Sequence, residues 1–220
     1  MNKWSYSSLS LFQQCPKKYY HLRVAKNAFD PPSHQMRYGL DAHKAAEEYV
    51  RDNTPLPTQF NYLQIPLDKL RSMPGKIYCE QKLGLTKDLE PCDFNAKDAW
   101  WRGIADFLCI DGDSAKVIDY KTGKNEYADT KQLERLSLAV FKHHPQVKSI
   151  KAALLFVIHI ALVREKYLHD EQEERWVKWV EETSRLDTAY ETNVWNPKQN
   201  FTCRAWCPVT NCKHNGRELL

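Results

Sequence analysis

The chain has 220 residues, with 32 Lys and Arg against 28 Asp and Glu, which gives a formal net charge of +4 at pH 7. This length can bury one sizeable core but hardly two, so we expect one domain over residues 1–220. The N-terminal MNKWSYSSLS lacks the apolar segment of a secretion signal, and the longest apolar run, AALLFVIHIALV, is too short to cross a bilayer. These features exclude a membrane partner and predict a cytoplasmic protein, located in the host cytoplasm if it is phage-encoded.

Charge is uneven along the chain. Residues 1–38 carry six Lys and Arg against one acid, residues 198–220 carry four against one, and the remainder carries 22 against 26. Basic ends in a chain with 26 aromatic residues (7 Trp, 11 Tyr and 8 Phe) could follow a phosphate backbone and stack bases. A solvated basic surface with the aromatic residues in the core explains the same distribution equally well.

Seven cysteines, an odd number, argue against a disulfide framework and indicate free thiols plus a metal site. Three of them are scattered and are expected to be small buried apolar residues: Cys79, Cys92 and Cys109. Three others lie within the ten residues CRAWCPVTNC: Cys203, Cys207 and Cys212. A tetrahedral site needs a fourth ligand, and its place is not evident from this stretch alone.

The N-terminal segment SYSSLSLFQQCPKKYYHLRV predicts two short helices that meet at Cys15. Ser10 and Gln13 have capping-box spacing in this segment, and Pro16 suits the first position of the second helix. Cys15 would then be the N-cap of that helix, with backbone N–H groups directed at its sulfur, which favours the thiolate.

The remaining elements are predicted in chain order from periodicity. Residues 38–50 form a helix with Leu40, His43 and Glu47 on one stripe, and residues 52–60 form a loop. The segments expected to be strands are 76–85, 101–110, 115–122 and the buried 150–160. Helices are expected at 129–144 and around Trp176, Trp179 and Tyr190. His143 and His144, at the end of the first of these helices, are expected at the surface. The order predicts an α/β fold with a mixed sheet.

A turn at 111–114 would pair Ile110 with Ala115 and place Asp106 opposite Asp119. Carboxylates about 5 Å apart repel each other unless a cation lies between them. Alternation places Lys121 on the face of Asp119, and two carboxylates with an ammonium group suit metal-assisted hydrolysis. An isolated D-x-K motif, however, more often comes from surface acids in a solvated hairpin.

Four segments occur in order: GLDAH at 39–43, GIADFL at 103–108, VIDYKTG at 117–123 and QLERLSLAV at 132–140. This set resembles the RecB-like branch of the PD-(D/E)XK nuclease superfamily, over residues 5–212. SSLSLFQQCP and the C-terminal cysteines resemble the iron–sulfur members of that branch. The resemblance implies a restriction-endonuclease-like core with a central mixed sheet flanked by helices. It also implies an iron–sulfur subdomain formed by residues 1–35 and 195–220.

Carried over by motif, the resemblance assigns the catalytic Mg²⁺ or Mn²⁺ to His43, Asp106, Asp119 and the main-chain carbonyl of Tyr120. Lys121 becomes the catalytic lysine, acting with the two aspartates. For His43, the residues alone are also consistent with an ordinary histidine on a half-buried helix.

Gln132 matches the family's glutamine motif, Q-x-x-x-Y, and is expected to belong to the catalytic set. The chain departs from the motif at Leu136, where the tyrosine belongs, which affects DNA contacts by that hydroxyl rather than metal binding. Glu80 could assist a second metal, and a solvated strand residue is an equally good interpretation.

The family's four-iron, four-sulfur site takes one cysteine before the nuclease core and three after it. The resemblance therefore implies a 4Fe-4S cluster on four thiols: Cys15, Cys203, Cys207 and Cys212. The spacing C-x3-C-x4-C differs from the more usual C-x2-C-x5-C. Zinc is the alternative, held by the same four thiols or with His214 in place of Cys15.

Together these features predict a metal-dependent DNA exonuclease that hydrolyses phosphodiester bonds in DNA repair or recombination, with single-stranded ends preferred. No G-x-x-x-x-G-K-[ST] motif is present, so no ATP motor is expected. The alternative is a catalytically weak, nuclease-like DNA-binding subunit of a recombination or spacer-capture complex. Protein partners would then come from replication, recombination or CRISPR systems.

Overall fold

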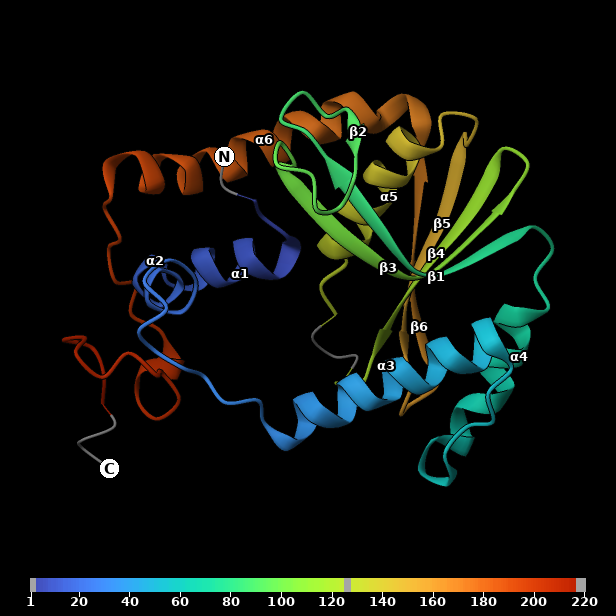
Figure 1. Cartoon of the computed structure of the whole chain (residues 1–220), viewed down its shortest axis with the longest axis horizontal. Coiled ribbons are helices and arrows are strands. Elements are labelled where there is room, and N and C mark those ends of the chain that lie inside the picture. Colours follow the sequence, from blue (N-terminus) through green and yellow to red (C-terminus); the bar gives the residue numbers. More distant parts are fainter. Residues whose placement is uncertain (1–2, 125–127, 217–220) are drawn as a thin grey trace. The chain divides into compact units, whose positions relative to one another are not determined.

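The computed structural model describes residues 3–124 and 128–216, which fall into two compact units (Figure 1). The first unit is Ser33–Trp176, and the second combines the described parts of Asn2–Pro32 and Val177–Leu220. No helix in the described parts of the chain is long and apolar enough to span a membrane. The assignment of one domain to residues 1–220 stays a prediction.

The first unit is built on a six-stranded sheet with the order β2-β1-β3-β4-β5-β6. Its strands are β1 (Lys76–Leu85), β2 (Pro91–Cys92), β3 (Trp101–Asp111), β4 (Ser114–Lys121), β5 (Ser149–Phe156) and β6 (Ala161–Leu168). Strands β4 and β5 are parallel and every other neighbouring pair is antiparallel, which confirms the predicted mixed sheet.

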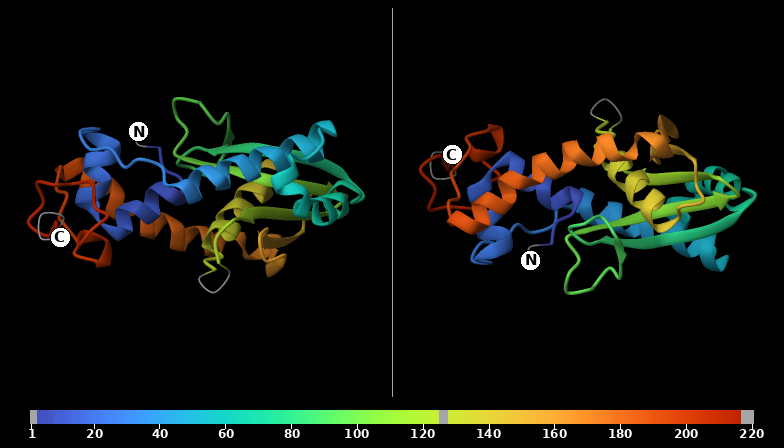
Figure 2. Two further views of the ribbon diagram at one scale, coloured as in Figure 1. Left: turned by 90° about the horizontal axis from the view of Figure 1, so that it is seen from below. Right: turned by 90° about the horizontal axis from the view of Figure 1, so that it is seen from above.

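Helices cover both faces of this sheet (Figure 2). The helices described in this unit are α3 (His34–Asp52), a 3-10 helix (Thr58–Leu63), α4 (Gln64–Arg71), α5 (Lys131–His143), a 3-10 helix (His169–Glu171) and the start of α6 (Gln172–Thr192). Helices α3 and α4 lie on one face and α5 on the other. On the α3 side, Tyr49 and Leu67 pack in one buried cluster with Phe107 and Tyr120 of the sheet. This arrangement is compatible with a restriction-endonuclease-like core.

Several elements were not expected from periodicity: β2, the 3-10 helix Thr58–Leu63 at the end of the predicted loop 52–60, β6 and α4. The segment 150–160 was predicted as one strand, but β5 ends at Phe156 and the chain returns as β6, in which only Tyr167 is buried. Continuous apolar character hides this turn, because periodicity does not mark where a fully buried strand stops. Helix α4 was also missed, since its eight residues, QIPLDKLR, are few and include Pro66.

The second unit joins the two ends of the chain around aromatic side chains. Its helices are α1 (Tyr6–Gln14), α2 (Pro16–Tyr19), a π-helix (Tyr20–Val24), the C-terminal part of α6 and a 3-10 helix (Phe201–Cys203). Tyr19 stacks on Trp195 with ring centroids 5.9 Å apart, and its hydroxyl lies 3.0 Å from that of Tyr190. Phe12 meets Trp195 edge-on. These contacts tie segments that are about 170 residues apart in sequence, since the Tyr19–Tyr190 separation is 171.

The predicted meeting of two helices at Cys15 is confirmed. Cys15 is the N-cap of α2, Pro16 follows it, and the Cys15 sulfur accepts a hydrogen bond from the Lys18 N–H at 3.4 Å. The predicted capping box of Ser10 and Gln13 is wrong, because α1 already begins at Tyr6 and is capped reciprocally by Ser5 and Ser8.

The predicted burial of four residues needs correction. Cys109 is buried, as expected, and its thiol donates to the Pro74 carbonyl, but Cys79 and Cys92 are only half-buried. His143 and His144, expected at the surface, are half-buried at the end of α5. The Nε2 atom of His143 lies 2.8 Å from the carbonyl oxygen of Gly84, so this ring connects α5 to β1.

Gly103 of β3 provides a test of this packing. A Cβ atom there would lie 2.7 Å from Cζ2 of Trp101, a fully buried side chain that has no room to move. We expect Gly103→Ala to lower the free energy of unfolding in urea by about 1–3 kcal/mol, the usual cost of overpacking. Gly123→Ala is the control, because a Cβ at Gly123 meets nothing within 4 Å. Equal stability of the two variants would contradict the packing at Gly103.

Candidate active site

The site lies where two neighbouring strands separate. Strands β3 and β4 pair from Asp111 and Ser114 to Phe107 and Ile118, which confirms the predicted register. Beyond Phe107, β3 stays with β1 while β4 stays with β5. Asp106 and Asp119 lie one step past the last pair, so the prediction that they face each other within the ladder is wrong. The separation leaves room for other side chains around both carboxylates.

The Asp106 side chain accepts a backbone hydrogen bond from β4 where β3 and β4 no longer pair. Its Oδ2 atom accepts the Tyr120 N–H at 2.7 Å and also lies 3.3 Å from Nδ1 of His43 on α3. Buried backbone N–H groups almost always have a partner, and here the Asp106 carboxylate serves in place of a strand carbonyl. The carboxylate is thereby fixed between α3 and the end of β4.

Asp119, Lys121 and Gln132 form a closed triangle. Oδ2 of Asp119 lies 2.5 Å from Nζ of Lys121, and Oδ1 accepts from Nε2 of Gln132 at 2.6 Å. The Lys121 ammonium group also donates to Oε1 of Gln132 at 2.8 Å. Alternation along β4 directs Lys121 and Asp119 to one side and buries Tyr120 on the other, as predicted. Gln132 comes from the first turn of α5, so the helix orients the lysine and the aspartate together.

Glu80 enters the site from β1 with an unusual backbone. Its φ is 51°, although the pairs on either side, Cys79 with Phe107 and Gln81 with Ala105, keep one register. A non-glycine residue in this region costs about 1–3 kcal/mol and such residues gather at functional sites. One potential ligand atom each from His43, Glu80 and Asp106 lie within 4.8 Å of one another.

The electrostatics of the site favour a cation. Burial, followed by the charges of Asp106 and Glu47, raises the pKa of Glu80 to about 7. Burial and the charge of Asp106 also raise the pKa of Asp119, although Lys121 acts in the opposite direction. Burial opposes protonation of His43, but its hydrogen bond to Asp106 and the charges of both aspartates raise its pKa overall. In the protein without a bound cation, the positive charge near these carboxylates is therefore too small to neutralise them.

The donor set fits a hard divalent cation, which prefers carboxylate oxygens and tolerates imidazole. His43, Glu80 and Asp106 could hold it, and Asp119 is engaged with Lys121 and Gln132 in this arrangement. The sequence-based metal set, His43, Asp106, Asp119 and the Tyr120 carbonyl, stays a prediction. The structure brings His43 and Asp106 together and adds Glu80, which had been assigned to a second metal.

One neighbour of the site was missed in the sequence. Glu47, one turn after His43 on α3, pairs with Arg51 and contributes to the raised pKa of Glu80. The stripe of His43 and Glu47 was the available signal. The replacement of the family tyrosine by Leu136 also has a structural context, because Leu136 is buried and its Cδ2 lies close to Gly103.

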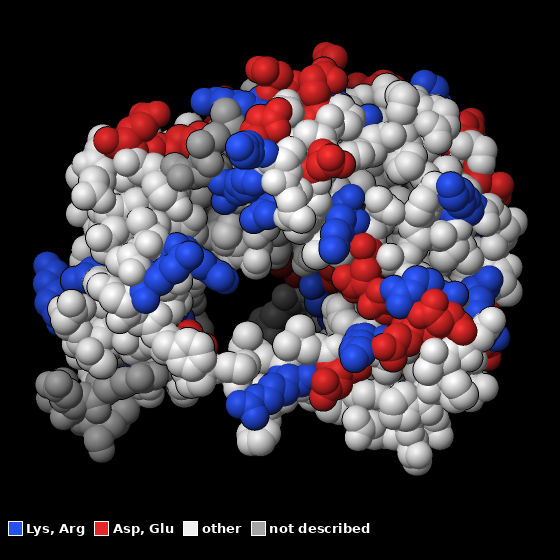
Figure 3. Space-filling view, in the orientation of Figure 1, with Lys and Arg blue, Asp and Glu red and all other residues white. Residues whose placement is uncertain are grey.

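Outside the site, the surface over α3 and α4 has mixed charge. Figure 3 shows basic and acidic side chains interleaved there. The ion pairs on these helices include Lys44 with Glu48, Arg51 with both Glu47 and Asp52, and Arg71 with Asp68. Such a face is typical of solvated helices and does not form a basic track for DNA.

Comparison with known proteins defines the class. The family model described as the PD-(D/E)XK nuclease superfamily matches residues 3–73 and 63–212, so the chain belongs to this superfamily. Such nucleases use divalent metals such as Mg²⁺ or Mn²⁺, and the family implies DNA as the substrate.

Two further comparisons add little. A solved structure titled "Crystal structure of SSO0001" is similar with a TM-score of 0.43 and 11% identity, over 98% of this chain and 88% of that one. A likeness this weak supports no argument about the site. Among curated proteins, no sequence matches.

Burial of Glu80 beside other carboxylates predicts that the stability of the folded protein depends on pH. The pKa of Glu80 is raised in the folded chain, so its contribution to stability is retained at low pH and lost as the pH rises through about 7. We expect Glu80→Gln to raise the melting temperature of chelator-treated protein at about pH 8.5 by roughly 2–4 °C, the shift for about 1 kcal/mol after discounting for solvent exposure. At about pH 5 the variant and the parent should melt together.

Thermal melts at both pH values, with the exposed Glu90→Gln as control, check this expectation. A Glu80→Gln variant that melts below the parent at high pH would show that the carboxylate is satisfied in the metal-free protein.

Proposed function

We propose that the protein is a metal-dependent DNA exonuclease that hydrolyses phosphodiester bonds. The observation that carries this proposal is the meeting of two groups where β3 and β4 separate. One is the potential metal-ligand set of His43, Glu80 and Asp106. The other is the triangle of Asp119, Lys121 and Gln132. Membership of the nuclease superfamily supports the same chemistry.

Each group has a distinct role in this proposal. A bound Mg²⁺ or Mn²⁺ supplies Lewis-acid stabilisation of the phosphate charge and makes a water molecule more acidic. The Lys121 ammonium group, held by Asp119 and Gln132, donates hydrogen bonds to the attacking water or to the phosphate oxygens. Because the side chain is fixed before substrate arrives, less of its rotamer entropy is lost during the reaction.

The exonuclease mode and the preference for single-stranded ends rest on the family resemblance and on the basic, aromatic character of the chain. Digestion of linear single-stranded DNA, linear duplex and covalently closed circles tests both points together. An exonuclease leaves the closed circle intact. Equal rates on circle and linear DNA would instead indicate an endonuclease.

The metal chemistry predicts different results for Asp119 and Lys121. Asp119→Ala should abolish cleavage, because it removes a buried carboxylate of the sequence-based metal set that also positions Lys121 and Gln132. Lys121→Ala should lower the cleavage rate by about 10²–10⁴-fold and leave Mn²⁺ binding intact, because the ammonium group acts on the reaction and not on the metal. His43→Ala should instead weaken Mn²⁺ binding, since His43 offers one ligand atom to the candidate metal set.

Calorimetric Mn²⁺ titration and single-turnover cleavage measure these effects, and circular dichroism checks that each variant is folded. An Asp119→Ala variant that cleaves at the parent rate would overturn the assignment. If the parent binds DNA and Mn²⁺ but does not cleave with either metal, the alternative of a catalytically weak DNA-binding subunit replaces it. Co-purification with neighbouring recombination or spacer-capture proteins would then identify its complex.

We also propose a 4Fe-4S cluster in the second unit, on Cys15, Cys203, Cys207 and Cys212. The Cys15 sulfur accepts two backbone N–H groups, from Lys18 and Lys198, each at 3.4 Å, as a thiolate ligand would. Burial raises the pKa of Cys207, and Cys203 and Cys15 raise it further, so these thiols are within electrostatic range of one another.

The order of the cysteines along the chain favours a cluster over zinc. Four thiols suit either group, but one cysteine before the nuclease core and three after it is the order of the iron–sulfur members that the chain resembles. The tail is fixed from within, because the Asn215 side chain donates to the carbonyls of Cys207 and Val209.

The cluster predicts a coloured protein. Anaerobically purified protein should be brown and contain iron and acid-labile sulfide in equal amounts. Cys15→Ala should remove the colour and lower the melting temperature as much as Cys207→Ala does, because the cluster contributes its binding energy to folding. Cys109→Ala, at a buried thiol of the first unit, is the control and should stay brown. A colourless protein with one zinc would contradict the cluster.

A further inference from the structure

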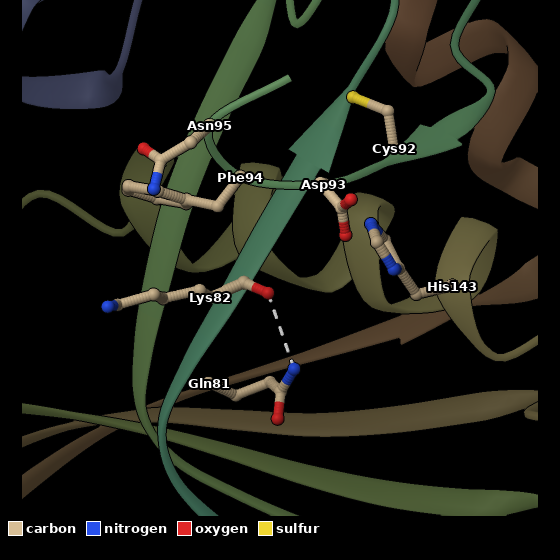
Figure 4. A pocket seen from close by; sticks show the side chains of 7 residues that line it. All are labelled: Gln81, Lys82, Cys92, Asp93, Phe94, Asn95 and His143. Carbon is tan, nitrogen blue, oxygen red and sulfur yellow. Dashed lines mark hydrogen bonds between the residues drawn. The ribbon is translucent and has the colours of Figure 1, made fainter.

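A polar pocket of about 560 Å³ lies beside β1 (Figure 4). Two of its lining residues, Gln81 and Lys82, directly follow Glu80 of the candidate active site. The pocket is lined by Gln81 and Lys82 of β1, by Asp93, Phe94 and Asn95 after β2, and by two further residues, Cys92 and His143. All of these residues belong to the first unit. None of them belongs to the proposed metal or catalytic residues, so the pocket is a separate feature of this unit.

Phe94 is the aromatic member of this pocket, and two cations approach its ring. Nζ of Lys82 lies 5.9 Å from the ring centroid and Cζ of Arg102 lies 5.0 Å from it. Both distances are within the range of cation–π attraction, so the half-buried ring is held before any ligand arrives. An aromatic ring flanked by cations is the combination that binds single-stranded nucleic acid, through stacked bases and neutralised phosphates.

The position along the strands connects the pocket to the candidate metal ligands. Lys82 follows Glu80 by two residues on β1, which is about 7 Å along the strand. Arg102 precedes Asp106 by four residues on β3, about 13 Å, and pairs with Gly84 of β1. The two cations therefore mark a path from the metal ligands along the paired strands β1 and β3.

We propose that Phe94 stacks one base of the DNA strand while Lys82 and Arg102 contact its phosphates. This inference rests on the proposed nuclease function and adds a substrate-binding subsite to it. The Asp93 carboxylate in the pocket repels phosphate, which directs the base inward and the backbone to the cations. The side-chain amides of Gln81 and Asn95 offer both donors and acceptors to a base edge, so the subsite can accept different bases.

A pair of substitutions at one position tests this proposal. Phe94→Tyr keeps the ring, whereas Phe94→Leu keeps an apolar side chain of similar size without it. Fluorescence anisotropy with a labelled oligothymidylate, in chelator to prevent cleavage, measures binding. We expect Phe94→Leu to weaken binding by about 5- to 100-fold, the range for loss of one stacked base, and Phe94→Tyr to bind within about twofold of the parent.

An abasic scan of the oligonucleotide identifies the stacked base. At one position, removal of the base should weaken binding by the parent and leave binding by Phe94→Leu unchanged. Lys82→Ala and Arg102→Ala should each reduce the salt dependence of binding by about 0.7 in the log–log slope, one phosphate contact each. Melting temperatures equal to the parent's show that the loop is intact in these variants.

The outcomes separate this proposal from the proposed function. If the parent cleaves and binds DNA but Phe94→Leu binds as tightly as Phe94→Tyr, the subsite is refuted and the nuclease assignment stands. If the parent neither binds nor cleaves DNA, the proposed function fails first. If Phe94→Leu melts well below the parent while the abasic scan shows no shared position, the ring is only a packing residue and the subsite is likewise refuted.

Discussion

The hydrogen bond from the Tyr120 N–H to the Asp106 carboxylate is the contact on which the site depends. Strands β3 and β4 stop pairing after Phe107 and Ile118, which would leave a buried donor without its strand partner. The carboxylate replaces the strand carbonyl, so the strands can diverge without an unsatisfied group between them. The same carboxylate then lies beside His43, and the gap admits side chains from α3, β1 and α5.

Without a bound cation, the residues of the site lower the stability of the fold. Glu80 has a backbone conformation that non-glycine residues rarely adopt, and its half-buried carboxyl lies within range of the charges of Asp106 and Glu47. Asp119 escapes part of this repulsion through Lys121 and Gln132. Buried like charges are tolerated when a cation or a substrate relieves them. The arrangement therefore has the physical character of a binding site and not of a structural ion-pair network.

The second unit has a different physical basis. A small assembly of short helices and irregular tail cannot bury much apolar surface, and here Tyr19, Tyr190 and Trp195 supply a compact aromatic centre that joins both chain ends. Cys15 lies at the junction of α1 and α2, with two backbone N–H groups at its sulfur. A metal cluster bridging these ends would close a long loop, which is where a cross-link constrains the unfolded chain most.

Local pattern in the sequence determined a good part of this protein. Alternation predicted β1 to the residue, the turn at 111–114 fixed the register of β3 with β4, and Pro16 located the N-cap at Cys15. Those features depend on neighbours in the chain, and so they can be read from it. The divergence of β3 from β4, the left-handed backbone at Glu80 and the burial of Leu136 against Gly103 depend on contacts between distant segments. Only the tertiary structure could decide that Glu80 joins His43 and Asp106, because strand pairing and helix packing, not sequence spacing, determine which carboxylates meet.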